Sequence, residues 1–219
     1  MTLREPPPGF PPRVDVRLDG WRLTWAELET VDVGVETFRA AFEKETARLT
    51  QRWHDRSISA DATVTEVRRL FRAAGCDPTR YRPSSEALLR RLHRDGVGST
   101  GVPVVDVNNL LSMRLRVPCC VIDPNAIAPP LTFRPGLPGE SMTAMRGPMR
   151  LDGKPVLADG VGPFGTPISD AERVKVSPDT RAVWMVVYLP ERGAEPVDLE
   201  GELAGLLRLM PVARVLAVA

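Results

Sequence analysis

The sequence predicts an α+β fold, because helical and strand-like segments are segregated along the chain instead of alternating. Apolar residues at helical spacing dominate the first half, and short strand-like runs separated by turns dominate the second, with a closing C-terminal helix. We therefore expect a single domain over residues 13–219, with a helical part at about 13–117 packed on a mostly antiparallel, strand-rich part at about 118–219. Residues 1–12 are rich in proline and are expected to be a flexible lead-in.

The first half predicts one short strand and three amphipathic helices. Residues 13–18 alternate apolar and charged side chains, which is typical of a strand. Residues 35–53 place aromatic and aliphatic side chains on one helical face and charges on the other. A second helix begins at Asp61 or Thr63 and ends at Gly75, and a third begins at Ser84 as its N-cap.

The second half predicts short strands joined by turns. The Asp152-Gly153 pair predicts a tight hairpin within residues 150–159. Residues 182–189 form an almost continuous apolar run, which indicates a strand covered on both faces. The remaining segments are expected to be strands at 120–122, 131–134 and 173–176, and a helix at 198–210.

Charge is balanced overall but uneven along the chain. The 29 basic and 28 acidic residues leave a formal charge of +1, so no global electrostatic argument for a nucleic-acid partner follows. Arginines nevertheless concentrate between residues 68 and 94. On the helix that begins near Ser84, they are either a solvated face or a face that contacts RNA phosphates. The candidate RNA-binding residues are Arg82, Arg90, Arg91 and Arg94.

Cys76, Cys119 and Cys120 do not form a disulfide framework, because their number is odd and two of them are neighbours. We expect all three to be thiols in a reducing compartment. The sequence has neither an apolar signal-peptide core nor an apolar run long enough to span a membrane. A soluble, cytoplasmic protein is therefore expected.

The segment from residue 103 to 123 combines polar side chains with apolar surroundings. Asp106, Asn108 and Asn109 lie in it close to Cys119 and Cys120. Buried amides need several hydrogen-bond partners, so neighbouring asparagines suit the floor of a pocket. Alternatively, Asp106 and the asparagines cap a helix that follows a strand.

Several common kinds of site are disfavoured. His54 and His93 both fall among charges on predicted helices, which disfavours a Ser-His-Asp triad. No paired metal-ligand motif and no glycine-rich phosphate loop is present, so neither a metal nor a cofactor is expected. Cys120 is either a nucleophile or a small buried apolar residue. Asp170 and Arg173 either belong to a surface turn and strand or pair with each other over a pocket.

Several motifs occur in the order in which they occur in a known family. The segments are VVDVNNLLSMRLRVPCCVIDPNAI, FRPGLPGESMTAM, DGKPVLADGVG and ISDAERVKVSPDT. Together they resemble the B3/B4 domain of the bacterial phenylalanyl-tRNA synthetase beta subunit. The upstream segment GCDPTRYRPSSEALLRRL is similar to the lead-in helix of free-standing versions of that domain, and the resemblance covers about residues 75–189.

The resemblance implies an α+β domain that hydrolyses tRNA carrying the wrong amino acid. Asn109 falls on the family's pocket asparagine, and Asn108 replaces the threonine before it. Cys120 falls where the synthetase places a pocket histidine, and the glycine-rich wall of the pocket corresponds to Gly160 and Gly162. By this resemblance, Asn108 and Asn109 are candidate catalytic residues, and Cys120, Gly160 and Gly162 are candidate substrate-binding residues.

Three hypotheses follow. The first is a free-standing editing-type domain that deacylates mischarged aminoacyl-tRNA, with fixed donors stabilising the developing oxyanion. The second is a non-catalytic module that binds tRNA, other RNA or a free amino acid. The third is a thiol-dependent enzyme that uses Cys119 or Cys120. The sequence leaves open whether the chain is an enzyme, which amino acid and tRNA it takes, and its oligomeric state.

Overall fold

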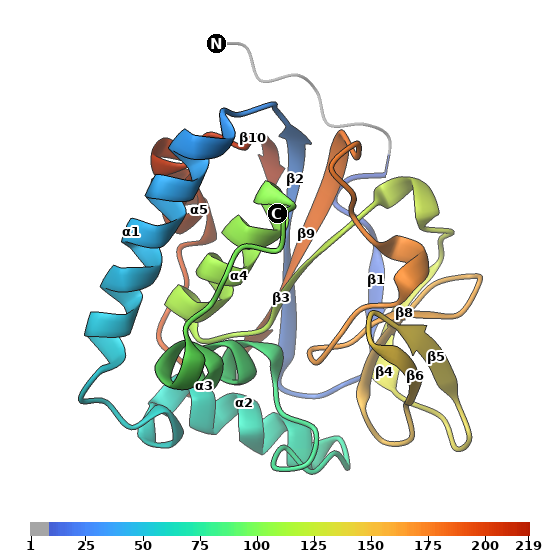
Figure 1. Cartoon of the computed structure of the whole chain (residues 1–219). Helices are drawn as coiled ribbons and strands as arrows, with labels where there is room; N and C mark the ends of the chain where they lie inside the picture. Colours follow the sequence, from blue (N-terminus) through green and yellow to red (C-terminus); the bar gives the residue numbers. More distant parts are fainter. Residues whose placement is uncertain (1–8) are drawn as a thin grey trace.

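The computed structural model describes residues 9–219 and combines helices with mostly antiparallel sheets, which confirms the predicted α+β class (Figure 1). The helices are α1 (Val35–Trp53), α2 (Ala62–Ala73), α3 (Ser84–Asp95), α4 (Pro103–Leu115) and α5 (Leu199–Leu209), with short 3-10 turns η1 (Ile58–Ala60), η2 (Pro124–Ala126) and η3 (Glu172–Val174). The strands are β1 (Val14–Val16), β2 (Trp21–Thr30), β3 (Cys119–Ile122), β4 (Leu131–Pro135), β5 (Ser141–Ala144), β6 (Gly147–Arg150), β7 (Pro155–Ala158), β8 (Pro163–Gly165), β9 (Ala182–Pro190) and β10 (Ala213–Val218).

A large sheet with strand order β10-β2-β9-β3 lies at the centre of the molecule, and all its neighbouring strands are antiparallel. Strand β9 pairs with β2 along its whole length, from Ala182 opposite Glu29 to Pro190 opposite Trp21. All residues of β9 after Ala182 are buried. The predicted strand with both faces covered is therefore confirmed.

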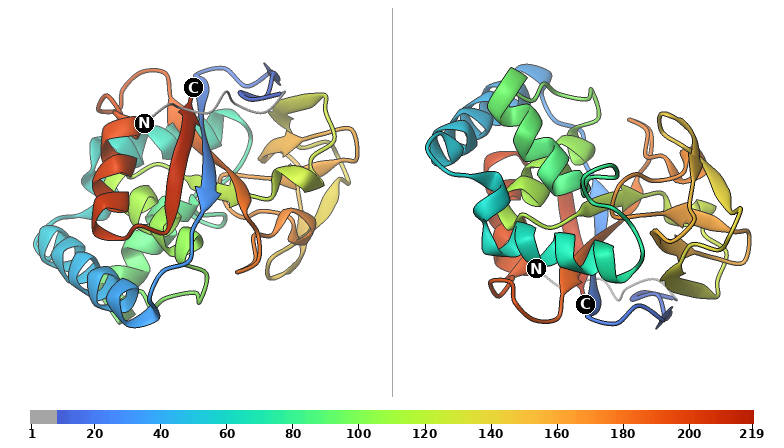
Figure 2. Two further views of the ribbon diagram at one scale, coloured as in Figure 1. Left: turned by 90° about the horizontal axis from the view of Figure 1, so that it is seen from above. Right: turned by 90° about the horizontal axis from the view of Figure 1, so that it is seen from below.

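The two faces of the large sheet have different partners. Helix α4 packs on β3 and is itself contacted by α1, α3 and α5, so the helices gather on one face (Figure 2). The other face meets a second sheet of order β1-β4-β7-β8, in which only the β1-β4 pair is parallel. Phe133 of β4 packs against Tyr188 and Trp21 across this interface, with ring centroids 5.5 and 5.9 Å away. The two sheets thus enclose an aromatic inter-sheet layer.

The predicted helices are confirmed, with small changes at their ends. Helix α2 begins after Asp61, whose carboxylate accepts a hydrogen bond from Val64 N at 3.1 Å. Such a side-chain cap satisfies one of the free N–H groups of the first turn. In α3 the cap position is held by Pro83, so Ser84 is the first helical residue and the predicted Ser84 N-cap is wrong by one position.

Strands β2 and β10 are absent from the sequence prediction. Strand β2 lies in the half expected to be helical, and β10 follows the helix expected to close the chain. Both belong to the large sheet, so the division at residue 117 does not describe how the sheet is built. That residues 13–219 form a single domain stays a prediction.

Two local predictions in the second half are wrong. The Asp152-Gly153 turn exists, with Gly153 at φ +65°, but the strands beside it pair elsewhere. Strand β6 pairs with β5, and β7 pairs with β4, because the chain crosses from the small hairpin into the second sheet at this turn. Residues 173–176 are no strand either, since the 3-10 turn η3 occupies their first half.

The predicted lead-in is only partly described. Residues 1–8 lie outside the described residues, whereas Phe10 and Pro12 are buried. The Phe10 ring packs 6.0 Å from the Trp184 ring of β9. Phe10 therefore packs against the large sheet, whereas Gly9 and Pro11 are exposed; that residues 1–12 form a flexible lead-in stays a prediction.

Candidate functional site

The polar segment that the sequence analysis identified forms helix α4. Its acidic residue, Asp106, is hydrogen-bonded to the loop that precedes the helix. Asp106 is fully buried and accepts hydrogen bonds from Thr100 N at 2.7 Å and from the Ser99 and Thr100 hydroxyls. The capping interpretation is wrong, because the N-cap of α4 is Val102 without a side-chain cap, no strand precedes the helix, and Asp106 lies in its first turn. Because all its oxygens are engaged in the loop, Asp106 is not available for chemistry.

The two asparagines have different surroundings. Asn108 is buried, and its Nδ2 donates to the Cys119 carbonyl at 3.3 Å, while its Oδ1 accepts no hydrogen bond from the described residues. Asn109 is half-buried. The Asn108 amide thus ties α4 to the first residue of β3, and Asn109 retains access to solvent.

Cys119 and Cys120 point to opposite faces of β3, as successive strand residues do. Cys119 lies beside Ser112 of α4, whereas Cys120 Sγ lies 3.9 Å from the Tyr188 hydroxyl in the inter-sheet layer. The structure consequently places Asn108 and Cys120 on opposite sides of the same strand. It does not bring their side chains together.

Cys120 belongs to a polar group between the sheets, which we call the Asp170 cluster: Cys120, Gly165, Asp170 and Tyr188. A side chain on Gly165 would place a Cβ 3.2 Å from the Tyr188 hydroxyl and 3.3 Å from Asp170 Oδ1, so glycine is what lets these groups converge. Tyr188 is fully buried, whereas Asp170 keeps some exposed surface. The cluster therefore lies at a margin of the inter-sheet layer.

A tight loop after β8 positions Asp170. The Thr166 hydroxyl accepts from Ser169 N at 2.9 Å and donates to the Ser169 carbonyl at 2.8 Å. Asp170 Oδ1 is buried and accepts no hydrogen bond from the described residues. Burial raises the pKa of Asp170 to about 7, an effect that the adjacent Cys120 thiol partly offsets. A carboxyl with such a pKa exchanges protons near neutral pH, which suits a general acid or base.

The thiols themselves are poor nucleophiles. Burial raises the pKa of Cys76 to about 11 and that of Cys119 to about 12. Burial, and then the nearby Asp170 carboxylate, raise the pKa of Cys120 well above its ordinary value. Since the thiolate is the reactive form, these environments disfavour a thiol-dependent enzyme.

The loop that carries Gly160 and Gly162 is held by a buried acid. Asp159 accepts hydrogen bonds from Ala128 N, Val161 N and Gly162 N, and its Oδ1 pairs with Arg173 Nη2 at 2.7 Å. The pairing suggested for Asp170 and Arg173 is therefore wrong, because Arg173 binds Asp159 instead. This loop packs against residues 126–128, and no described contact joins it to Cys120.

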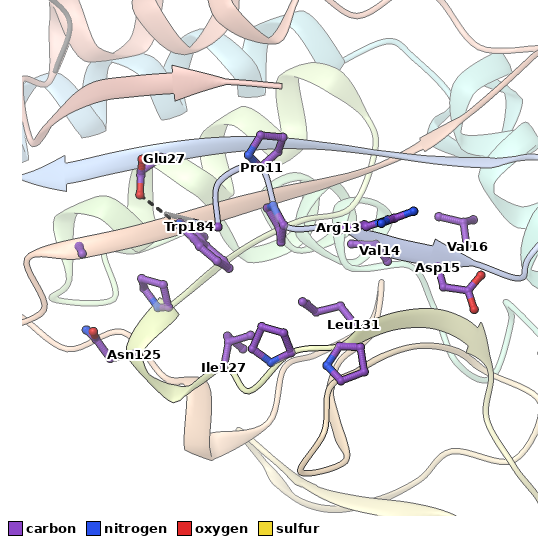
Figure 3. Close-up of a pocket in the computed structure, with 16 residues that line it drawn as sticks. Pro11, Arg13, Val14, Asp15, Val16, Glu27, Asn125, Ile127, Leu131 and Trp184 are labelled. Carbon is purple, nitrogen blue, oxygen red and sulfur yellow. Dashed lines mark hydrogen bonds between the residues drawn. The ribbon is translucent and has the colours of Figure 1, made fainter. Parts of the chain in front are cut away.

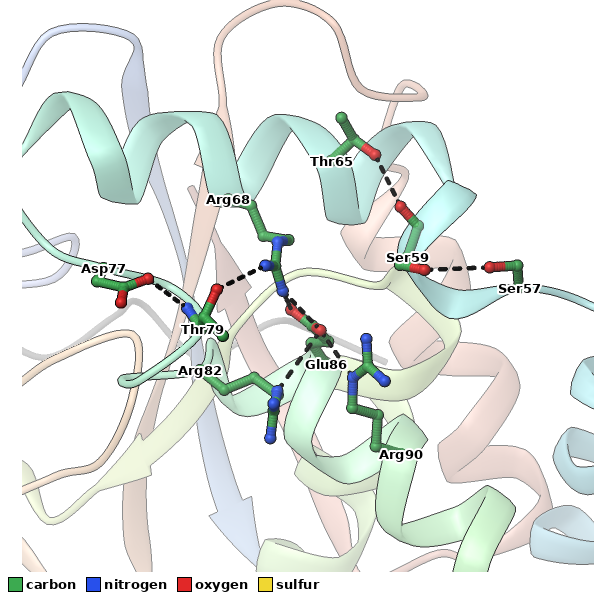
Figure 4. Close-up of polar contacts among 9 residues, drawn as sticks. All are labelled: Ser57, Ser59, Thr65, Arg68, Asp77, Thr79, Arg82, Glu86 and Arg90. Atoms are coloured by element: carbon green, nitrogen blue, oxygen red, sulfur yellow. Dashed lines mark hydrogen bonds and ion pairs between the residues drawn. The ribbon is translucent and has the colours of Figure 1, made fainter.

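The predicted RNA-binding arginines separate into two groups. Glu86 of α3 is fully buried and binds Arg68 Nη1 through both oxygens, at 2.9 and 3.0 Å, while Arg90 Nε donates to it at 2.8 Å (Figure 4). Arg82 Nε lies 3.6 Å from the same carboxylate. We call Arg68, Arg82, Glu86 and Arg90 the Glu86 cluster. Arg94 instead pairs with its neighbour Asp95, and Arg91 is half-buried.

The Glu86 cluster carries a surplus of positive charge at the surface. Three guanidinium groups surround one carboxylate, and the Arg82 and Arg90 side chains are about 40% exposed. Among the described residues, the Nη groups of Arg82 and Arg90 have no acceptor. Arg90 is fixed through its Nε hydrogen bond, whereas Arg82 Nε lies beyond hydrogen-bond distance of Glu86. The free Nη donors of both guanidinium groups can bind phosphate in a forked geometry.

Sequence reasoning considered Asp170 only as an alternative partner of Arg173 over a pocket and missed its proximity to Cys120. It also missed the contributions of Tyr188, Arg68 and Glu86. The position of Glu86 four residues from both Arg82 and Arg90, at helical spacing, could have indicated its role. The distance in sequence between Cys120 and Asp170 left no such signal. Among residues 9–219 no group of three His, Cys, Asp or Glu side chains is placed to hold a metal ion, and no helix could span a membrane.

Comparison with known proteins gives one family model and several similar solved structures, one of which is described here. No curated protein matches the chain. The crystal structure of an N-terminal fragment of the phenylalanyl-tRNA synthetase beta-subunit from Pyrococcus horikoshii is similar over 92% of this chain, with 14% identity and a TM-score of 0.43. This chain covers 50% of that fragment. The family model for the B3/4 domain matches residues 66–194, more than half of the 219 residues. The chain therefore belongs to the B3/4 domain family.

Proposed function

We propose that this protein is a free-standing hydrolase that removes the amino acid from mischarged tRNA. The observation that carries the proposal is Asp170, a largely buried carboxyl with a pKa of about 7, beside Cys120. Cys120 is the residue that falls on the pocket histidine of the B3/B4 editing domain. A base that titrates near neutral pH, at the edge of the inter-sheet layer, is what hydrolysis of an activated ester requires.

In this mechanism the Asp170 carboxylate accepts a proton from a water molecule as the water oxygen attacks the ester carbonyl. The Tyr188 hydroxyl donates to the oxyanion that develops, and the departing ribose hydroxyl recovers the proton from Asp170. Cys120 shapes the wall of the site. Asn108 and Asn109 were the expected catalytic residues; here half-buried Asn109 is proposed as a substrate contact, and Asn108 as a positioning residue that fixes β3 through the Cys119 carbonyl. Gly160 and Gly162 stay proposed elements of the pocket wall.

A panel of tRNAs, each charged with a non-cognate amino acid, tests the proposal. We expect the full chain to release at least one amino acid well above the buffer rate, because an ester needs only a positioned water and a base. Amino-acid release is measured from labelled aminoacyl-tRNA. If no member of the panel is deacylated above background, the hydrolase assignment is wrong.

The Glu86 cluster favours a second candidate function, binding of tRNA without catalysis. Each phosphate contact makes the affinity fall with salt, by a slope of roughly 0.7 to 0.9 per contact in a plot of log K against log salt. We therefore expect the double variant R82Q/R90Q to bind tRNA about tenfold more weakly, with a slope smaller by about 1.4 to 1.8. Fluorescence anisotropy at several salt concentrations measures both quantities.

Arg94→Gln is the matched control, because Arg94 lies on the same helix but is paired with Asp95. It should change the tRNA affinity much less than the double variant. Equal losses in the two proteins, or an affinity of the wild-type chain that does not depend on salt, would argue against the Glu86 cluster as the RNA contact.

A further inference from the structure

A separate pocket opens at the other end of the inter-sheet layer. It has a volume of about 1170 Å³ and is bounded by β1, by residues of β2 and β9, and by the loop at residues 124–131 (Figure 3). Trp184, which lines this pocket, is four residues from Tyr188 on the same face of β9, a separation of about 13 Å along a strand. The pocket is therefore distinct from the Asp170 cluster.

The pocket walls are mostly apolar. Five prolines, at positions 11, 12, 124, 129 and 130, supply rigid apolar surface together with Ile127, Leu131 and the Trp184 ring. Two polar lining residues are already engaged with neighbours, since Asp15 pairs with Arg17 and Asn125 donates to Asp123. Such walls fit a ligand with a compact apolar body.

Glu27 differs from the other lining residues, because it is only 2% exposed and forms no ion pair with any cation among residues 9–219. Its Oε1 accepts a hydrogen bond from Trp184 Nε1 at 3.3 Å, and its Oε2 is buried without a partner among the described residues. Arg13, the cation among the lining residues, points away from Glu27 (Figure 3). Burial raises the pKa of Glu27, and the Trp184 hydrogen bond partly offsets this.

An unpaired carboxyl at this depth is unfavourable unless something neutralises it. A metal ion is a poor match, because no group of three acidic, histidine or cysteine side chains forms a metal site among residues 9–219. An organic cation fits better: its ammonium group can donate to the free lone pairs of Glu27, and the Trp184 ring attracts positive charge.

We propose that this pocket binds a primary amine with an apolar body, held by an ion pair between its ammonium group and Glu27. This binding does not depend on the proposed hydrolysis at Asp170. The probe is phenethylammonium, and the neutral 2-phenylethanol, which has the same body without the charge, is the comparison ligand. Isothermal titration calorimetry on the full chain gives both dissociation constants.

We expect Glu27→Gln to raise the Kd for phenethylammonium at least tenfold. The glutamine oxygen still accepts from Trp184, so this variant keeps the local structure and loses only the charge. Glu29→Gln is the matched control, since Glu29 lies on the same face of β2, is partly exposed and pairs with Arg214. The control should leave the Kd unchanged.

A second variant, Ala182→Trp, tests the location independently by filling the pocket while retaining Glu27. It should also raise the Kd at least tenfold, and wild-type protein should prefer the amine to the alcohol by at least tenfold. Equal affinity for amine and alcohol, an unchanged Kd in Glu27→Gln, or no binding of the amine at millimolar concentration would each overturn the proposal.

Discussion

Replacing Asp170 with asparagine is expected to lower the rate of aminoacyl-ester hydrolysis by about 10²- to 10⁴-fold, the usual contribution of a general base. The asparagine side chain has the same shape but cannot accept a proton at neutral pH. The same change should make the folded protein more stable at pH 8, because it removes a carboxylate that is charged in a poorly solvated place. Loss of activity together with a gain in stability separates a catalytic role from a structural one.

The pH dependence has a defined sign. The ordinary pKa of an aspartate is 3.8, and that of Asp170 in the folded protein is about 7, so between these values the folded state holds a proton that the unfolded state releases. The stability that Asp170 confers is complete below about pH 4 and is lost as the pH rises to about 7. Hydrolysis changes in the opposite direction and should increase through pH 7, as the base ionises.

At pH 8 the free energy of unfolding of Asp170→Asn should exceed that of the wild type by about 2 kcal/mol. This is roughly half of the free energy that corresponds to the full pKa shift, because Asp170 is partly exposed. Near pH 4 the two proteins should be equally stable. Urea denaturation at both pH values measures this. Asp179→Asn, in an exposed turn, is the control and should change neither activity nor stability. Wild-type activity in Asp170→Asn would refute Asp170 as the base without refuting hydrolysis.

Glu86→Gln is expected to destabilise the protein by about 3 to 5 kcal/mol, the usual cost of removing one partner of a buried ion pair. Arg68 is largely buried, and Glu86 supplies both oxygens that Arg68 contacts. Without that carboxylate, Arg68, Arg82 and Arg90 repel one another around a neutral amide. The free energy of unfolding in urea at pH 7 and low salt is the appropriate measurement.

Glu200→Gln provides a matched control, because Glu200 also lies in the first turn of a helix but is exposed. Both substitutions lose the favourable interaction of an acid with the helix dipole, so the difference between them reports the Glu86 cluster alone. In a double-mutant cycle, removing Arg68 as well, as Arg68→Leu with Glu86→Leu, should recover much of the lost stability. A loss below about 1 kcal/mol in Glu86→Gln would mean that the cluster is not a stabilising unit.

The sequence predicts α1, α2, α3 and α5 well, because each carries its own apolar face, whereas α4 is buried on most sides and was only one alternative for its segment. The range 35–53 coincides with α1, and Asp61 and Asp198 cap α2 and α5 as short-range patterns suggest. Strand β2 was not predicted from the sequence. Its central residues are buried on both faces, and the buried charge of Glu27 interrupts its apolar pattern. The pairing of β6 and β7 is decided by partners in other strands, which the Asp152-Gly153 turn does not encode.

The candidate site, like the fold, has features that the sequence predicts and features that depend on distant residues. Family motifs draw attention to Cys120, which lies in the Asp170 cluster, but the partner acid is 50 residues away in sequence. The sequence pattern therefore indicates Cys120 and, as one alternative, Asp170 over a pocket, but it does not indicate that the two side chains lie together. Similarly, the arginines of α3 are visible as a charged face, whereas the role of Glu86 depends on Arg68 from a different helix.

The order in which the large sheet is completed has a consequence for biosynthesis. Strand β2 pairs with β9 on one side and with β10 on the other. Thr30 therefore cannot complete its pairing with β10 until Ala213 has been synthesised. A growing chain on the ribosome therefore carries an incompletely hydrogen-bonded β2 through most of translation. Such long-range pairing slows folding and leaves an open strand edge in the meantime, so chaperone assistance should matter most for this segment.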